Sequence, residues 1–165
     1  MNTQVMTDFS QFATTGVTLE WGLKESFRAY FERLSDHSYQ FADGACRLNN
    51  GQFVYEIVPE ASDRNKLVFS GTVQLEAHFG ALSVKIAHPV IDQNASTGEI
   101  GLSAEVDEHN GEPVRMLIAT LEQSLDGAES LVFRAQLADE GQYLFMGNYF
   151  SGDELDPVSV VRPDR

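Results

Sequence analysis

One stretch of the sequence has a strong helical pattern, and it reads Trp21-Gly22-Leu23-Lys24-Glu25-Ser26-Phe27-Arg28-Ala29-Tyr30-Phe31-Glu32-Arg33-Leu34. Its large apolar residues recur at intervals of three and four, which is the spacing of one helix face. Those residues are Leu23, Phe27, Tyr30, Phe31 and Leu34. A single amphipathic helix has to bury this stripe on another element, and the rest of the chain has the patterns of strands and turns. We therefore expect one helix packed against a sheet.

The surface of this helix carries two hydroxyl groups. Ser26 and Tyr30 are four residues apart, so a hydroxyl and a phenol project from the same side, one turn from each other. Aromatic residues on a helix usually pack, and position alone predicts that Tyr30 is a core residue. A functional role for its phenol needs support from elsewhere in the sequence.

The segments on either side of the helix are short. Residues 1–16 are mostly small and polar, and we expect a flexible N-terminal arm there. Residues 17–20 have the pattern of a short strand, and residues 35–44 have the Asp, His and Gly content of a loop. We expect a single folded domain over residues 17–161 and a C-terminal tail over residues 162–165.

Two asparagine-glycine turns predict hairpins. Asn49-Asn50-Gly51 separates the runs 45–48 and 52–58, and Asn110-Gly111 lies between the runs 98–106 and 114–121. Asn-Gly between two apolar runs is the strongest short-range signal for a hairpin.

Residues 67–77 alternate between apolar and polar side chains, which predicts one half-buried antiparallel strand. By this parity His78 belongs with the polar face, at a tight junction before the next strand begins at Leu82. Gly80 can supply a bulge or turn that redirects the histidine side chain.

Further strands are expected at residues 131–137, at the aromatic-rich residues 142–150, and as a last short edge at residues 157–161. About nine or ten strands at this spacing are typical of a sandwich or barrel. The predicted fold class is a mainly β domain, an antiparallel β-sandwich or barrel-like domain with one amphipathic helix packed against it.

Composition limits the candidate functions. A chain of 165 residues fits one domain with a sizeable core, and its 42% apolar content excludes a disordered chain. The net charge of -14 repels phosphate backbones and anionic lipid, so we expect no nucleic-acid partner. No apolar run approaches the roughly 18 residues that span a bilayer, so no membrane insertion is expected.

Cys46 is the only cysteine, which excludes an intramolecular disulfide and a cluster of thiolates around a metal. The first 20 residues contain no Lys, no Arg and no long apolar run, so no signal peptide is visible. On that ground we expect a cytoplasmic location.

No arrangement in the sequence nominates a catalytic site. A Gly-x-Ser-x-Gly elbow, a phosphate-binding glycine loop and a His-Glu-x-x-His helix are all absent. The four histidines lack the short spacings of a metal site, and the acidic pairs fall in predicted turns, where solvation explains them. We expect a protein that is not an enzyme; a hydrolase built on two carboxylates is the enzymatic alternative.

Three segments resemble the motifs of the haem-transport-associated (HtaA) domain family, in the same order. Residues 21–30 resemble its opening motif, Trp-Gly-x-Lys-x-Ser-Phe-Arg-x-Tyr. Residues 71–82 resemble its Gly-x-Val-x-Phe-x-x-His-x-Gly-x-Leu segment, with Leu75 in place of the usual Phe. Residues 148–158 are similar to its closing Tyr-x-x-Gly-x-x-Leu-Asp-Pro-Val. The resemblance covers about residues 18–161.

The resemblance implies a mostly β domain that binds ferric haem b. Carried over position by position, Tyr30 looks like the axial ligand of the iron, His78 like the residue that hydrogen-bonds its phenolate, and Ser26 like a contact to a haem propionate. Tyr149 matches a family tyrosine near the pocket. Family members are typically exported and attached to the cell surface. This implies a secreted or cell-envelope location and other haem-uptake proteins as partners, and it is compatible with a homodimer.

This set of residues suits ferric iron. A free tyrosine has a pKa of about 10 and is a weak neutral ligand, whereas Fe(III) and a donating imidazole both favour the phenolate. A hard oxygen ligand prefers ferric over ferrous iron, which suits acquisition, transfer or storage of haem. Apolar side chains near the motifs are candidate walls of the pocket: Phe27, Phe79, Tyr143, Met146 and Phe150.

A function of another class remains in competition. It is a β-sandwich interaction module without haem, or a carrier that holds a lipid-like apolar ligand in a pocket under the helix.

Overall fold

The structure is a computed structural model that describes residues 6–107, 112–126 and 130–163 of the chain. Eight strands of this part close a barrel: β1 (Thr18–Trp21), β4 (Phe53–Ile57), β5 (Lys66–Ser70), β7 (Leu82–Gln93), β8 (Ile100–Asp107), β9 (Pro113–Asp126), β10 (Ser130–Leu137) and β11 (Glu154–Val161). Three shorter strands are added to the barrel: β2 (Ser38–Ala42), β3 (Cys46–Arg47) and β6 (Thr72–Ala77). The helical elements are α1 (Glu25–Glu32) and four 3-10 turns, η1 (Phe9–Phe12), η2 (Pro59–Ala61), η3 (His78–Gly80) and η4 (Glu140–Phe145).

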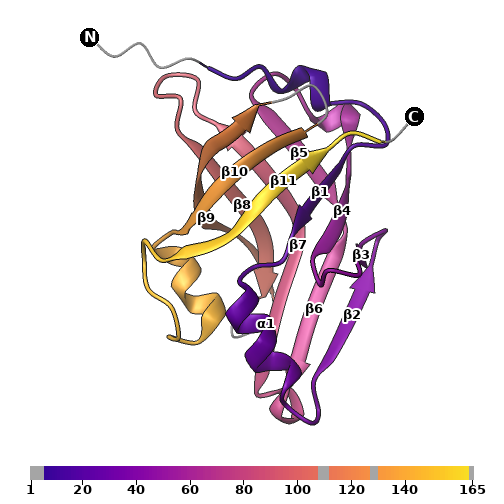
Figure 1. Cartoon of the computed structure of the whole chain (residues 1–165), viewed down its shortest axis with the longest axis vertical. Helices are drawn as coiled ribbons and strands as arrows, with labels where there is room; N and C mark the ends of the chain where they lie inside the picture. The colour runs from indigo at the N-terminus through magenta and orange to yellow at the C-terminus, as the bar shows by residue number, and fades with distance from the viewer. Residues whose placement is uncertain (1–5, 108–111, 127–129, 164–165) are drawn as a thin grey trace.

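Every strand pairing is antiparallel, and the neighbours around the barrel run β7, β5, β4, β1, β11, β10, β9 and β8. The pairing of β8 with β7 closes the ring. Figure 1 shows the barrel with α1 and η4 at its lower end and η1 at its upper end. The predicted mainly β, barrel-like domain that carries one helix is confirmed.

One wall of the barrel divides into two halves. The single strand expected over residues 67–77 is broken at Gly71, where φ is +131°. Its first part, β5, pairs with the second half of β7, and its second part, β6, pairs with the first half. Between these halves His88 has a φ of 49° and the pairing of β7 with β8 shifts register. As a result β6 and its outer neighbour β2 extend toward the end of the molecule that carries α1 (Figure 1).

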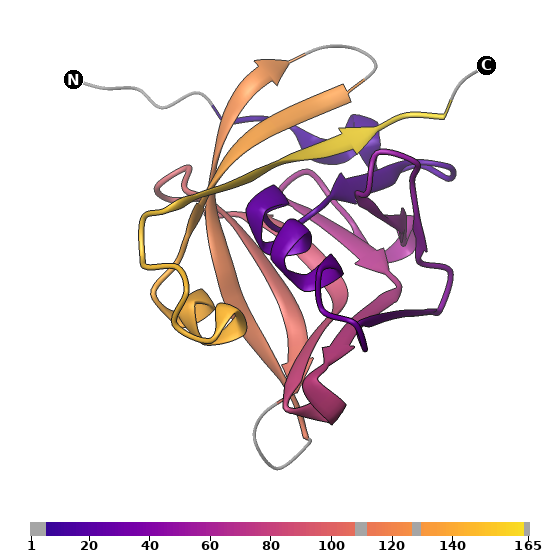
Figure 2. The same cartoon turned by 60° about the horizontal axis from the view of Figure 1, so that its bottom comes forward.

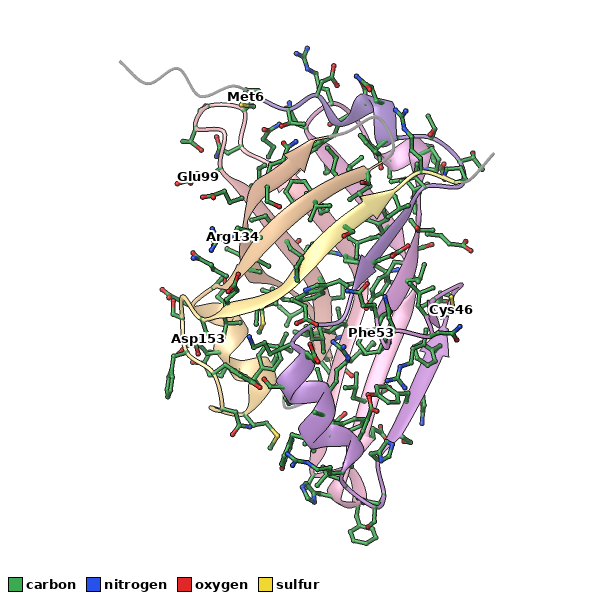
Figure 3. The ribbon with its side chains drawn as sticks, viewed as in Figure 1. Met6, Cys46, Phe53, Glu99, Arg134 and Asp153 are labelled. Carbon is green, nitrogen blue, oxygen red and sulfur yellow. The ribbon has the colours of Figure 1, made fainter. Side chains whose placement is uncertain are left out.

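Within residues 35–44, expected to be a loop, lies the strand β2. Tyr39 and Phe41 alternate with exposed residues, and their rings pack around the buried Phe53 of β4 at 5.8 and 6.1 Å between centroids. Figure 3 labels Phe53 where it lies near α1 and β2. Pairing with β6 and the packing of two aromatic residues at alternate positions hold this five-residue edge strand, although residues 35–44 have the composition of a loop.

Two expectations near the C-terminal end are also corrected. Residues 142–150 were expected to be a strand, but residues 140–145 form the 3-10 turn η4, and Met146 ends it in the left-handed conformation with φ 54°. The predicted last edge over residues 157–161 is the longer strand β11, which lies inside the sheet between β1 and β10.

The first asparagine-glycine hairpin is confirmed, because β3 and β4 pair around Asn49-Asn50-Gly51 and the Gly51 N–H donates to the Leu48 carbonyl at 3.0 Å. The second predicted turn, Asn110-Gly111, lies outside the described residues.

Part of the expected N-terminal arm is packed on the barrel. Phe9 and Phe12 of η1 are buried, and Asp8 caps the turn by accepting a hydrogen bond from the Ser10 N–H at 2.9 Å. Two phenylalanines in a polar segment bury enough apolar surface to dock it. Among the described residues, no helix has the length and apolar character needed to cross a membrane.

Candidate functional site

α1 lies across the lower mouth of the barrel, as Figure 2 shows with that end turned forward. Phe27 and Phe31 of its apolar stripe are buried, as the helical spacing predicts. Tyr30, which position alone assigned to the core, is 39% exposed. The helix therefore presents one aromatic residue of its stripe to solvent.

Ser26 and Tyr149 meet beside α1. The Ser26 hydroxyl and the Tyr149 hydroxyl are 2.6 Å apart, and either one can donate. The ring of Tyr149 also contacts Phe27 of α1 and Phe145 of η4, with centroid distances of 6.5 and 5.2 Å. Since Tyr30 lies one turn after Ser26, these contacts bring Ser26, Tyr30 and Tyr149 to one side of the helix.

Exposed apolar side chains gather on the turns around this helix. η4 and the loop after it carry Tyr143, Met146 and Phe150, which are 79%, 57% and 66% exposed. The loop is held by Asp153, labelled in Figure 3, whose carboxylate accepts from the Phe150 N–H at 2.8 Å. Of the expected pocket walls, Phe27 alone is buried beneath this surface.

His78 lies on η3, the tight turn between β6 and β7, at the junction where the alternation placed it. Both His78 and Phe79 have positive φ, 52° and 55°, and the Phe79 side chain is fully exposed. Asp36, in the segment after α1, accepts a hydrogen bond from the Phe79 N–H at 2.8 Å. That bond, followed by one from the His78 backbone, lowers the pKa of the Asp36 carboxyl. The turn that carries His78 is thus tied to the C-terminal end of α1.

The imidazole of His78 is exposed, and within the described part of the chain no hydrogen bond joins it to Tyr30. The two residues belong to the same end of the molecule, but the contact expected between their side chains is not made in this structure. The pairing of His78 with Tyr30 therefore stays a prediction.

Residues with a left-handed backbone conformation concentrate around α1, η3 and η4. Six described residues other than glycine have positive φ, and four of them are Leu23 before α1, His78 and Phe79 on η3, and Met146 after η4. This conformation costs about 1–2 kcal/mol for each residue with a side chain. Such outliers cluster where a site fixes particular side chains, which marks this end of the barrel as a candidate site.

The phenol of Tyr30 differs from the phenols that serve the fold. Tyr55 donates to the Ile86 carbonyl at 3.2 Å and Tyr39 donates to Glu32 at 2.7 Å, and burial raises the pKa of both. In the described residues, the Tyr30 hydroxyl has no protein partner. It is therefore free to bind a ligand.

The described residues offer few other candidate centres. They contain no group of three or more His, Cys, Asp or Glu side chains that could hold a metal ion. A cavity of about 780 Å³ lies over β8 and β9 and is lined by Gln93, Glu99 and Glu122 among others, but by no predicted site residue. Figure 3 labels Glu99, which lies far from α1.

Sequence reasoning missed the residues that hold this site together, Asp36, Arg28 and Asp156. Asp36 lies in a segment whose composition indicated only a loop. Arg28 belongs to the opening motif and Asp156 to the closing motif. Each motif specifies the residue type at that position, but it does not indicate what the residue does. Asp156 accepts from the Glu25 N–H at the start of α1 and lies 2.6 Å from Arg28 Nη1.

Comparison with known proteins adds two kinds of likeness. The HtaA family model, described as Htaa, matches residues 16–161. Among solved structures, the C-terminal domain of HtaA from Corynebacterium glutamicum is 25% identical with a TM-score of 0.67, over 87% of this chain and 93% of that one. The N-terminal domain of the same protein is 22% identical with a TM-score of 0.69, over 90% and 97%.

A third structure, heme binding protein HtaB from the same organism, is 15% identical with a TM-score of 0.66, over 90% of this chain and 93% of that one. No curated protein matches the chain. The second and third likenesses concern the fold alone, whereas the family model spans the barrel, α1 and all three motif segments. On that match, this chain belongs to the HtaA family.

Proposed function

We propose that this protein binds ferric haem, with the phenolate oxygen of Tyr30 as the axial ligand of the iron. The observation that carries the proposal is the state of Tyr30. It is a tyrosine on an otherwise buried helix stripe, it is 39% exposed, and its hydroxyl has no partner among the described residues. Membership of the HtaA family supports haem as the bound molecule.

The surface around Tyr30 fits the two parts of a haem. Apolar side chains on η3, on η4 and on the following loop supply faces for the porphyrin, which is largely apolar. The hydroxyl groups of Ser26 and Tyr149 are 2.6 Å apart, and the one that accepts in this pair keeps its own proton to donate to a propionate on the same side of the helix. Bound haem supplies the ferric iron, whose charge favours the phenolate form of Tyr30.

His78 has a different role in the proposal. Its imidazole donates to the Tyr30 phenolate and stabilises the negative charge on the oxygen. Since no such bond exists in this structure, His78 has to turn toward Tyr30 when the ligand binds. An exposed side chain on a short turn has the freedom to do so.

A binding protein with a phenolate ligand holds oxidised haem and releases reduced haem more readily. This behaviour serves acquisition, transfer or storage of haem, and we propose these functions in place of an enzymatic one. Hand-over to other haem-uptake proteins at the cell envelope belongs to the same proposal, on the ground of family membership.

The first prediction tests the ligand. Hemin added to the purified protein should give a Soret band and the charge-transfer absorption of ferric tyrosinate. Tyr30→Phe should abolish the charge-transfer absorption and leave the unfolding midpoint unchanged, because the ring is kept and only an exposed oxygen is lost.

Tyr143→Phe is the matched control, since it removes an equally small group from an exposed tyrosine of the same surface. It should leave the charge-transfer band in place. The ligand assignment fails if Tyr30→Phe keeps the spectrum or if Tyr143→Phe loses it. If hemin gives no bands with the unaltered protein, the exposed apolar surface serves an interaction or a lipid-like ligand instead.

A further inference from the structure

We infer that Asp156 of β11 is a positioning residue for the haem site, because it holds α1 in the orientation that presents Tyr30. This inference rests on the proposed role of Tyr30. Asp156 belongs to the closing motif and Tyr30 to the opening one, 126 residues earlier in the chain. The contacts of Asp156 make the two motifs one structural unit, and four of its polar atoms take part.

The carboxylate of Asp156 caps α1 from a distant strand. Its Oδ1 accepts a hydrogen bond from the Glu25 N–H, the first residue of the helix, at 2.9 Å. The residue in the local capping position, Lys24, makes no side-chain cap. A carboxylate at this end also interacts favourably with the helix dipole. The start of α1 is therefore fixed by β11 and not by its own sequence.

The backbone of Asp156 fixes the hinge between β1 and α1. Its carbonyl accepts from the Trp21 indole N–H at 2.9 Å, and its N–H donates to the Leu23 carbonyl at 2.9 Å. Leu23 is fully buried and left-handed, with φ 64°. A residue with a side chain keeps this conformation only where its surroundings impose it, and Asp156 is part of those surroundings.

The second carboxylate oxygen of Asp156 forms an ion pair with a side chain of α1. Asp156 Oδ2 lies 2.6 Å from Arg28 Nη1, which also donates to the Gly22 carbonyl at 2.6 Å. The two side chains are only 11% and 16% exposed. Gly22 leaves room for this arrangement, since a Cβ there would overlap the guanidinium and lie 3.1 Å from Asp156 Oδ2. Arg28 is two residues before Tyr30 on the same helix.

These contacts bear on Tyr30 because α1 is short. An eight-residue helix is marginal on its own, so its rotation about its axis depends on contacts with neighbouring elements, both the packing of Phe27 and Phe31 and polar contacts. The Asp156 contacts at Glu25 and Arg28 fix that rotation at two points. Rotation of α1 would move the Tyr30 oxygen and the Ser26 hydroxyl together, away from the surface formed by η3 and η4.

The second prediction tests this positioning role with Asp156→Asn, which keeps the size and the acceptor for Glu25 but removes the charge that pairs with Arg28. We expect faster hydrogen exchange at the amides of residues 25–32 in the ligand-free protein, with β8 to β10 unchanged. We also expect hemin binding weakened by roughly tenfold or more, as for partners that orient a metal ligand, and a shifted tyrosinate band.

Glu154→Gln is the matched control on the same strand, because Glu154 forms an exposed pair with Arg134 at 3.8 Å. It should change neither the exchange of α1 nor hemin binding. Gly22→Ala is the second test variant. It displaces the guanidinium but keeps the bond from Asp156 to Glu25, so it should give the same changes to a smaller degree. If Asp156→Asn does not fold, Gly22→Ala alone tests the positioning role.

The positioning role is overturned if both test variants bind hemin like the unaltered protein, or if binding weakens without faster exchange in α1. These failures differ from a failure of the proposed function. Without a tyrosinate spectrum from the unaltered protein, Tyr30 is not the ligand, and the exchange measurements alone still report whether Asp156 holds α1.

Discussion

At the scale of single residues, the backbone conformation of His78 decides which substitution can test the role of its side chain. His78 is left-handed, with φ 52°, and asparagine tolerates this conformation better than alanine. The third prediction is therefore made for His78→Asn. Loss of the imidazole donor should weaken hemin binding by roughly tenfold and shift the tyrosinate band, since the phenolate loses a stabilising hydrogen bond. Absorption titrations measure both effects.

His88→Asn is a close control, because His88 is also left-handed, with φ 49°, but lies in the middle of β7. It should leave hemin binding and the spectrum unchanged. An equal effect of the two substitutions would mean that His78 acts on the fold and not on the phenolate.

The sequence predicted the residues of the candidate site better than their geometry. The three motifs identified Ser26 and Tyr149 separately, and the structure joins their hydroxyls at 2.6 Å. Alternation along β6 placed His78 at the strand end. The left-handed turn could not be predicted, because histidine and phenylalanine seldom adopt this conformation and because Asp36, which accepts from the Phe79 N–H, is distant in the sequence.

At the scale of elements, the carboxylate of Glu32 ties α1 to β2 and β3. Its Oε2 accepts from the Tyr39 hydroxyl at 2.7 Å and lies 2.6 Å from Arg47 Nη2. The hydrogen bond from Tyr39 is the main cause that lowers the pKa of Glu32, and Arg47 adds to it. Burial raises the pKa of Tyr39, so its hydroxyl remains a donor.

The fourth prediction concerns pH. A carboxyl whose pKa is lowered by folding adds stability above its unfolded pKa, about 4.3 for glutamate, and loses that contribution as the pH falls through the folded value. Glu32 is 39% exposed, so solvent limits the contribution to about 1 kcal/mol or less. Glu32→Gln should lower the urea unfolding midpoint at about pH 6, and the difference should shrink progressively as the pH falls below about 4.3.

Tyr39→Phe removes the donor and should reproduce most of this pH dependence, because the hydrogen bond is the main cause of the lowered pKa. A difference between Glu32→Gln and the unaltered protein that stays constant across the pH range would show that the carboxylate is not responsible.

Elements with a clear period were predicted, and elements held by remote contacts were not. The apolar period of residues 21–34 gave α1, although Trp21 ends β1 and the helix begins four residues later, where Asp156 caps it. The aromatic residues 142–150 suggested a strand. They form η4 and a loop instead, because Phe145 packs edge-on against Phe27 of α1 at 5.1 Å.

At the scale of the whole molecule, barrel closure depends on partners far apart in the sequence. Val160 of β11 pairs with Leu19 of β1 on one side and with Leu131 of β10 on the other. Alternation predicted which side of each strand is buried, for example Leu67 and Phe69 of β5. It could not distinguish a closed barrel from a sandwich, because both have the same pattern of buried and exposed residues along each strand.

This closed barrel separates the residues that stabilise the fold from those of the proposed site. Phe9 of η1 is fully buried at the end opposite α1, with its ring edge-on to Phe133 at 6.3 Å (Figure 1). The fifth prediction is that Phe9→Ala lowers the free energy of unfolding by about 3–5 kcal/mol and leaves the hemin affinity of the folded protein unchanged.

Phe79→Ala should leave the free energy of unfolding unchanged and weaken hemin binding. Its ring is fully exposed on η3, so its loss removes no core contact, but it takes away one apolar face offered to the porphyrin. Urea unfolding and hemin titration of the two variants, at a temperature where both are folded, give four values to compare. If Phe9→Ala weakens hemin binding as much as Phe79→Ala does, the two ends of the barrel are coupled. The haem site would then depend on the packing of the whole barrel and not on the surface around α1 alone.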